Sequence, residues 1–119
     1  LARIEERFSM NESETIEEEV YHFGETTFCY NNNELRTRSS RVLITSRQAD
    51  ILRLLAKNIG NVVSKEMIQE AVWGTVSYAN SLAVNVQMTY LRHALQHDAT
   101  VKIESLKKKG YVLSVISPE

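Results

Sequence analysis

The chain has 119 residues, 43% of them hydrophobic, which is enough apolar material for one buried core of ordinary size. Its 14 Lys and Arg against 15 Asp and Glu give a net charge of −1, which excludes a uniformly basic protein that coats nucleic acid by charge alone. The single cysteine, Cys29, excludes an internal disulfide and leaves a cysteine-based zinc site without ligands. No apolar run approaches the roughly 18 residues of a membrane span, so we expect one domain in the reducing cytoplasm.

The acidic residues are concentrated at the start of the chain. Residues 1–19 contain seven Glu and two Arg, a net charge of −5, and the rest of the chain is net basic. A stretch this acidic and this poor in apolar residues buries too little surface for its ordering to be favourable. We therefore expect an acidic linker over 1–19 and a folded domain over 20–119. Because the sequence starts at Leu1 rather than Met, we expect it to be a piece of a longer protein.

Residues 20–44 predict a small antiparallel sheet. Short β-branched and aromatic runs alternate with turn formers such as Gly24 and the asparagines at 31–33. The predicted strands cover 20–23, 26–30, 34–38 and 41–44.

Three helices are predicted after this sheet. Thr45 and Gln48 have the spacing of a capping box, so the first helix begins there, and Gly60 is its expected terminator. Ser64 is the expected cap of the second helix. Its predicted buried stripe consists of Met67, Ile68, Ala71 and Val72.

The third helix is expected to run from a cap at Ser81 to about His97. Its core stripe is predicted from the helical period as Val84, Met88, Leu91 and Leu95. The opposite face is unusually apolar for a solvated surface, with Leu82, Val86, Thr89, Tyr90, His93 and His97. Residues 101–106 and 111–116 then predict a hairpin whose tip carries the three lysines at 107–109.

This helix and this cationic hairpin together have the layout of a nucleic-acid reader. Helix side chains can meet base edges in the major groove while the lysines meet phosphates. A lysine run alone is more typical of a solvated turn, but three capped helices in this order favour a helix-turn-helix.

The sequence gives no support for a metal site or for catalysis. His93 and His97 are spaced i, i+4, but a third strong ligand is missing because His22 lies in a distant strand. The chain has no glycine-rich phosphate loop, no Gly-x-Ser-x-Gly elbow and no His-Glu-x-x-His motif. We therefore expect no metal, no cofactor and no enzymatic activity.

Five ordered blocks of residues resemble one known family. They are Ile44-Thr45 with Ile51, Leu52 and Leu55; Val62-Val63-Ser64-Lys65-Glu66 with Ile68; Ala71-Val72-Trp73-Gly74; Val84-Asn85-Val86-Gln87-Met88 with Leu91-Arg92; and Ile103-Glu104-Ser105-Leu106-Lys107 with Gly110-Tyr111. Over residues 20–117 this pattern resembles the winged-helix effector domain of OmpR/PhoB-type bacterial response regulators in two-component systems. The resemblance implies an α+β fold with an N-terminal four-stranded antiparallel sheet, three helices and a C-terminal β-hairpin wing.

The resemblance also implies sequence-specific binding of double-stranded DNA by a transcriptional regulator. The third helix would enter the major groove, and the wing would lie at the adjacent backbone or minor groove. The DNA-contacting positions that it implies are Ala83, Val86, Gln87, Thr89, Tyr90, Arg92, Ser105 and Lys107. Relatives usually carry an acid at position 85 and often a base at 89 and 90, so their base preferences do not transfer to this chain.

The resemblance further implies partners. Residues 74–81 correspond to a loop that touches RNA polymerase in some relatives, and the opening Leu1-Ala2-Arg3-Ile4 resembles the end of a receiver domain, expected at 1–8. A receiver implies a cognate sensor kinase. The alternatives are a ToxR/CadC-like regulator tethered to a membrane and a winged-helix protein-interaction module that does not bind DNA. We expect the fragment to be a monomer that pairs on direct-repeat DNA.

Within the expected site, Arg92 and Lys107 are predicted to support affinity, and the lysines at 108 and 109 to matter less. Val86 lies about 160° from the core stripe, with Tyr90 on the same side. An exposed apolar pair predicts a partly apolar partner, which in the major groove is a thymine methyl. The alternative is that Val86 is buried beneath the wing.

Overall fold

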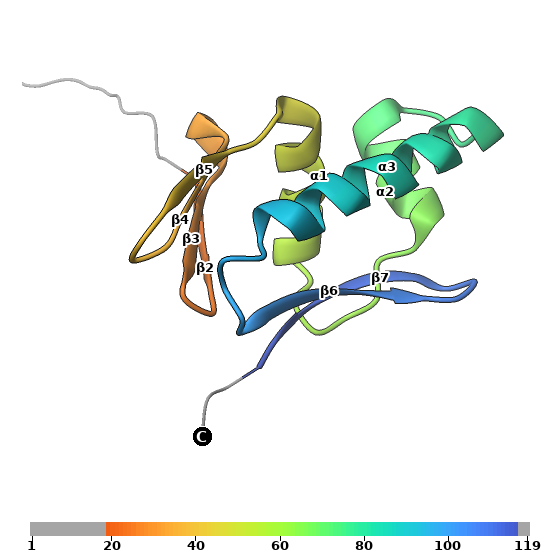
Figure 1. The fold of residues 1–119 in the computed structure, drawn as a ribbon. Coiled ribbons are helices and arrows are strands. Elements are labelled where there is room, and N and C mark those ends of the chain that lie inside the picture. The colour runs from red at the N-terminus through yellow and green to blue at the C-terminus, as the bar shows by residue number, and fades with distance from the viewer. Residues whose placement is uncertain (1–18, 117–119) are drawn as a thin grey trace, which may run out of the picture.

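The computed structural model describes residues 19–116, whose arrangement is drawn in Figure 1. A four-stranded antiparallel sheet stands at one side of three helices, and a hairpin runs beneath them. The predicted winged-helix fold class is confirmed. Residues 1–18 of the linker predicted over 1–19, and with them the receiver-domain end expected at 1–8, lie outside the described residues. Within the described part, no helix combines the length and the apolar content of a membrane span.

The elements follow the predicted order. The sheet contains β2 (Val20–Phe23), β3 (Thr26–Cys29), β4 (Glu34–Arg36) and β5 (Arg41–Leu43), each paired with its neighbour in sequence. The helices are α1 (Ser46–Ala56), α2 (Lys65–Trp73) and α3 (Tyr78–Ala94), and the wing consists of β6 (Val101–Leu106) and β7 (Gly110–Val115). Strand β3 is shorter than predicted because Tyr30–Asn32 form the 3-10 turn η1, which Asn33 closes in the left-handed region at φ 52°.

One core joins the sheet, the helices and the wing. Phe28 and Leu35 of the sheet, Leu52 of α1, Met88 of α3 and Leu113 of β7 all belong to the same buried cluster. The predicted core stripe of the third helix is confirmed, because all four of its members are buried. Fully burying one such side chain contributes about 1.5 to 3 kcal/mol, so this core fixes the orientation of α3.

The helix starts at Thr45 and Ser64 are confirmed. The Gln48 backbone N–H donates to Thr45 Oγ1 at 3.1 Å and the Thr45 N–H donates to Gln48 Oε1 at 3.0 Å, which completes the capping box. The Met67 N–H donates to Ser64 Oγ at 3.0 Å. The expected role of Gly60 is wrong: α1 ends at Ala56, and Gly60 instead donates its N–H to the Leu113 carbonyl at 2.9 Å.

The third helix begins earlier than predicted and ends earlier. Ser77, not Ser81, is its cap and accepts the Asn80 N–H at 3.1 Å; the helix ends at Ala94, before His97. The loop expected over 74–81 is therefore confined to 74–77. It is this short because buried Gln69 of α2 accepts the Ser77 N–H through Oε1 at 2.9 Å and fixes the turn.

The predicted stripe of the second helix is half wrong. Ile68 is fully buried and Val72 is half-buried, but Met67 and Ala71 face solvent. Gln69 takes the inward position in their place because its side chain is needed at the start of α3.

Asp98 ties the N-terminal sheet to the segment between α3 and the wing. It is only 3% exposed. Its carboxylate accepts the Glu25 N–H at 2.8 Å, the Thr26 hydroxyl at 2.7 Å, and the Thr100 N–H and hydroxyl at 2.9 and 2.5 Å. At Gly24 the chain passes so close to this contact that a Cβ there would lie 2.2 Å from Thr100 Oγ1, which leaves no room for a side chain. Burial alone would raise the pKa of Asp98, but these hydrogen bonds outweigh burial and hold the pKa below its usual value.

We expect the stability of the domain to depend on ionised Asp98. Because the folded pKa is depressed, this stabilisation is complete above the unfolded pKa of about 3.9 and is lost as the pH falls through the folded value. Asp98→Asn should lower the free energy of unfolding by about 1 to 3 kcal/mol at pH 7. The NH2 group of the asparagine would face N–H and O–H donors from which it cannot accept a hydrogen bond. It should also flatten the decline in melting temperature below pH 4, measured by circular dichroism. Glu70→Gln on the surface of α2 is the control, and an equal effect from it would contradict the assignment.

Candidate nucleic-acid interface

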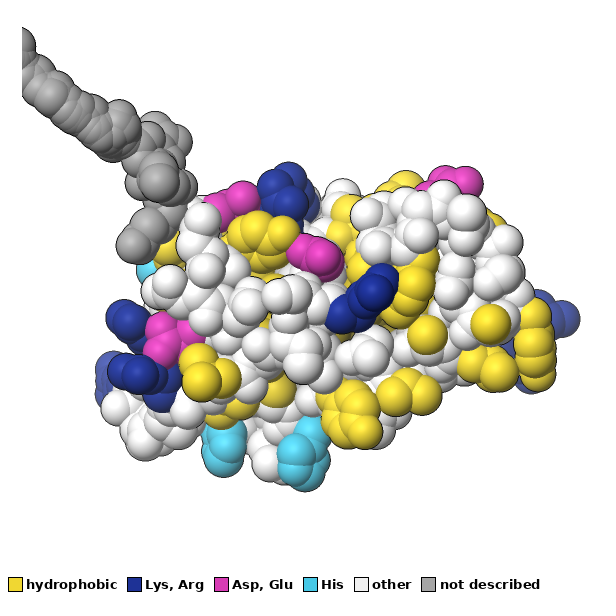
Figure 2. All heavy atoms as spheres, turned by 90° about the horizontal axis from the view of Figure 1, so that it is seen from above, with side chains coloured by type: hydrophobic (Ala, Val, Ile, Leu, Met, Phe, Trp, Pro, Cys, Tyr) yellow, Lys and Arg dark blue, Asp and Glu magenta, His cyan; other side chains and the backbone are white. Residues whose placement is uncertain are grey.

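The outward face of α3 is exposed and apolar, as predicted. Leu82 is 47% exposed, Val86 50% and Tyr90 56%. Val86 therefore does not lie beneath the wing. Hydrophobic side chains gather along the edge of the molecule that α3 forms, beside histidine side chains (Figure 2).

The predicted contact residues do not all share this face. Val86, Thr89 and Tyr90 face solvent on α3, and Ser105 and Lys107 are exposed on the wing. Ala83 and Gln87 are half-buried flanking residues, and the Gln87 Oε1 atom is buried without a hydrogen-bond partner among the described residues.

Two of the polar side chains on α3 are engaged by the wing. The Tyr111 hydroxyl donates to Asn85 Oδ1 at 2.9 Å, and Arg92 Nε donates to the Ile103 carbonyl at 3.1 Å. Burial raises the pKa of Tyr111 against the opposing effect of the Arg92 guanidinium, so the hydroxyl keeps its proton at neutral pH. Arg92 therefore connects α3 to the wing through a hydrogen bond and is also an exposed cation.

The wing is held against the start of α2 by a close backbone approach. Val63 and Tyr111 exchange backbone hydrogen bonds of 2.8 and 2.9 Å and form a single strand bridge. A Cβ on Gly110 would lie 2.1 Å from the Val63 carbonyl oxygen, so only glycine fits here. As a result the wing tip lies beside the first turn of α2.

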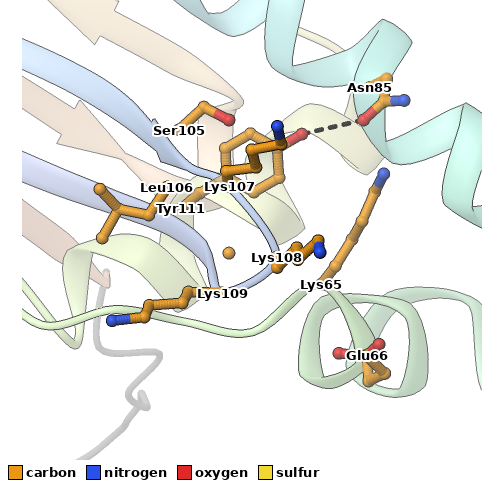
Figure 3. A pocket seen from close by; sticks show the side chains of 10 residues that line it. Lys65, Glu66, Asn85, Ser105, Leu106, Lys107, Lys108, Lys109 and Tyr111 are labelled. Carbon is orange, nitrogen blue, oxygen red and sulfur yellow. Dashed lines mark hydrogen bonds between the residues drawn. The ribbon is translucent and has the colours of Figure 1, made fainter.

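A lysine-lined hollow of about 240 Å³ lies at this junction. We call it the lysine cradle. Four lysines line it, Lys65 of α2 and Lys107, Lys108 and Lys109 of the wing tip, against one carboxylate, Glu66; the remaining lining residues are Asn85, Ser105, Leu106, Gly110 and Tyr111. Figure 3 shows Lys65 extending toward Asn85, Lys108 pointing toward the Lys65 side chain, Lys107 beside Tyr111, and Lys109 pointing away from them. The ion pairs of residues 19–116 involve none of these lysines.

Two of the cradle lysines stand where local structure disfavours them. Lys65 is in the first turn of α2, where the positive end of the helix dipole repels a cation. Lys108 is in the left-handed region at φ 65°, which costs a residue with a side chain about 1 to 2 kcal/mol. Unpaired cations that are close together and locally unfavourable indicate a site for an anion.

The sequence did not single out Lys65, and it predicted a smaller role for Lys108 than for Lys107. Lys65 carried a usable signal, a cation directly after the helix cap Ser64. Lys108 carried no such signal, because both of its neighbours in the wing tip are also lysines. Only its left-handed backbone conformation distinguishes it from them.

An outward helix face beside a cationic wing defines the class of a winged-helix DNA-binding domain. A family model described as "Transcriptional regulatory protein, C terminal" matches residues 39–113. The response regulator ArlR of Staphylococcus aureus is 32% identical over 81 residues, which are 67% of this chain and 37% of ArlR.

Solved structures share the fold. The DNA-binding domain of CpxR from E. coli has a TM-score of 0.73 at 20% identity, covering 83% of this chain and 99% of that one. The DNA-binding domain of RstA from Klebsiella pneumoniae, solved in complex with the RstA box, has a TM-score of 0.69 at 23% identity, covering 80% and 96%.

The chain belongs to the family of C-terminal domains of transcriptional regulatory proteins, the OmpR/PhoB-type DNA-binding domains of response regulators. It spans less than half the length of the curated relatives it matches, between 37 and 49% of the first three.

Lys108→Gly should separate stability from DNA binding. Glycine adopts the left-handed conformation without strain, so we expect the free energy of unfolding to rise by up to about 1 kcal/mol. Affinity for duplex DNA should fall at the same time, because the cradle loses a charge. The comparison is Lys109→Gly, which removes the same charge from a side chain pointing away and should weaken binding less. Equal losses of affinity for the two variants would contradict the placement of Lys108.

Proposed function

We propose that this domain binds operator DNA with α3 in the major groove and the lysine cradle on the phosphate backbone beside it. The observation that carries the proposal is the cradle itself, four lysines gathered next to the outward face of α3 in a chain of net charge −1. Phosphates supply the anions that these lysines lack, and the register they set brings α3 to the base edges.

The predicted contact residues take different roles in this proposal. Val86, Thr89 and Tyr90 face the bases, and Ser105 and Lys107 face the backbone from the wing. Ala83 and Gln87 border the contact, and Arg92 holds the wing through the Ile103 carbonyl while its remaining N–H groups stay available for a phosphate. The domain acts by binding, without catalysis of its own.

We propose a response-regulator architecture for the longer protein. A receiver domain would precede this chain, and a cognate sensor kinase would phosphorylate that domain in the cytoplasm. Relatives such as ArlR, named as a response regulator, support this architecture over a membrane-tethered one. The short turn at 74–77, where Val76 is exposed, is the surface that we assign to RNA polymerase.

A winged-helix module that binds only protein is the competing function. The exposed apolar face of α3 suits it, but the cradle lysines, which form no ion pair within residues 19–116, favour DNA. The two functions differ in their response to salt, because only phosphate binding releases condensed counterions.

Titration of the chain against random-sequence duplex should show binding that weakens steeply between low and moderate salt, measured by fluorescence anisotropy. Lys107→Ala should lower the slope of log K against log salt by about one, as expected for one lost phosphate contact. The matched control is Lys57→Ala at the end of α1, which removes the same charge beside Glu19, away from the cradle. Binding to no duplex at low salt would overturn the proposed function.

The fragment should sediment as a monomer at micromolar concentration and pair only on DNA. On direct repeats about one helical turn apart, two copies should bind on the same face of the duplex. Sedimentation of a stable dimer without DNA would contradict this expectation.

A further inference from the structure

The outward face of α3 carries a regular row of large apolar and aromatic side chains. Tyr78, Leu82, Val86 and Tyr90 follow one another at intervals of four residues, and the first of them, Tyr78, is 80% exposed. We call Leu82, Val86 and Tyr90 the apolar row. At 100° per residue, members four positions apart differ by only 40°, so all three point outward.

Several polar side chains of the same helix already make hydrogen bonds within the protein, although those of Asn85, Thr89 and Arg92 remain exposed. Asn85 Oδ1 accepts the Tyr111 hydroxyl, and the Thr89 hydroxyl donates to the Asn85 carbonyl at 3.1 Å. Arg92 Nε donates to the Ile103 carbonyl, and the Gln87 Oε1 atom is buried. Some of the polar atoms that could hydrogen-bond a base edge are therefore already bonded within the protein. The side chains of the apolar row are exposed and have no such partner among the described residues.

The surroundings of the row identify its occupant. It lies on the helix beside the lysine cradle, so the partner is a polyanion, and it contains no acidic residue that would repel one. The partner must also offer apolar groups at the bottom of a groove. In duplex DNA only the C5-methyl group of thymine does this in the major groove.

We propose that the apolar row reads thymine methyl groups, so that the operator is specified by thymines more than by hydrogen-bonding base edges. The inference rests on the proposed function, since it requires α3 to lie in the major groove. Leu82 and Val86 each contact one methyl group, and Tyr90 packs beside the next base with its hydroxyl toward the backbone. Residues four apart lie about 6 Å apart along the helix, close to two base-pair steps of about 3.4 Å. The thymines are therefore expected about two steps apart.

The test begins with selection of preferred sites from random-sequence duplex by the 119-residue chain. Each thymine of the selected site is then replaced by uracil, which removes only the methyl group. Loss of a buried methyl contact should weaken binding about fourfold at each of two positions. Val86→Ser should abolish the thymine preference at one of these positions, and Leu82→Ser at the other.

Controls separate reading from folding. Val86 and Leu82 are about half exposed, so their serine variants should keep the wild-type melting temperature. Val115→Ser replaces an exposed valine at the end of β7 opposite the wing tip and should leave both thymine preferences intact.

Three results would overturn the inference. Specific binding that is unaffected by uracil at every position refutes thymine reading and leaves the proposed function intact. No binding to any duplex removes the proposed function and the inference together. Self-association of the chain that Val86→Ser abolishes assigns the row to a second copy instead.

Discussion

The contact between Gly110 and the Val63 carbonyl is the constraint on which the rest of the interface depends. The two backbones approach so closely that no side chain fits between them, and paired hydrogen bonds between Val63 and Tyr111 fix the register. Val63 immediately precedes the cap of α2. The position of the wing tip relative to that helix is therefore set by backbone atoms, which are stiffer than side chains, and the cradle exists because of it.

The same junction between the wing and α2 also engages polar side chains of α3. Tyr111, placed by its backbone pairing, engages Asn85, and Ile103 on the partner strand engages Arg92. Both hydrogen bonds orient the helix against the wing, and each occupies a polar atom of an α3 side chain. The contacts that place α3 rigidly therefore also occupy polar atoms beside its exposed apolar row.

The sequence alone predicted the order and type of the strands and α-helices, because periodicity, caps and turn formers are local signals. It predicted the buried stripe of α3 and its exposed face for the same reason. It misplaced the start of α3 and the buried face of α2 because both depend on Gln69, whose amide reaches the Ser77 N–H across a turn. Gln69 looks like an ordinary surface residue until that turn is known. For the interface, sequence located the helix face and the wing but not Lys65 in the cradle, which requires two distant segments to meet.

The hydrogen bonds of Asp98 to Glu25, Thr26 and Thr100, called the Asp98 clasp below, indicate how much of the chain is needed for the domain to fold. The Asp98 clasp joins residues 26 and 98, which are 72 positions apart, and so closes nearly the whole domain into a ring. Closing a loop of this length is an entropic cost that only contacts formed late in folding can offset. The sheet strands β2 to β4 precede the family-matched region at 39–113, yet they supply Thr26, Phe28 and Leu35 to the clasp and the core. A chain trimmed to the matched residues would leave the Asp98 carboxylate with only half its hydrogen-bond donors, so we expect the unit that folds on its own to be larger than the region matched by the family model.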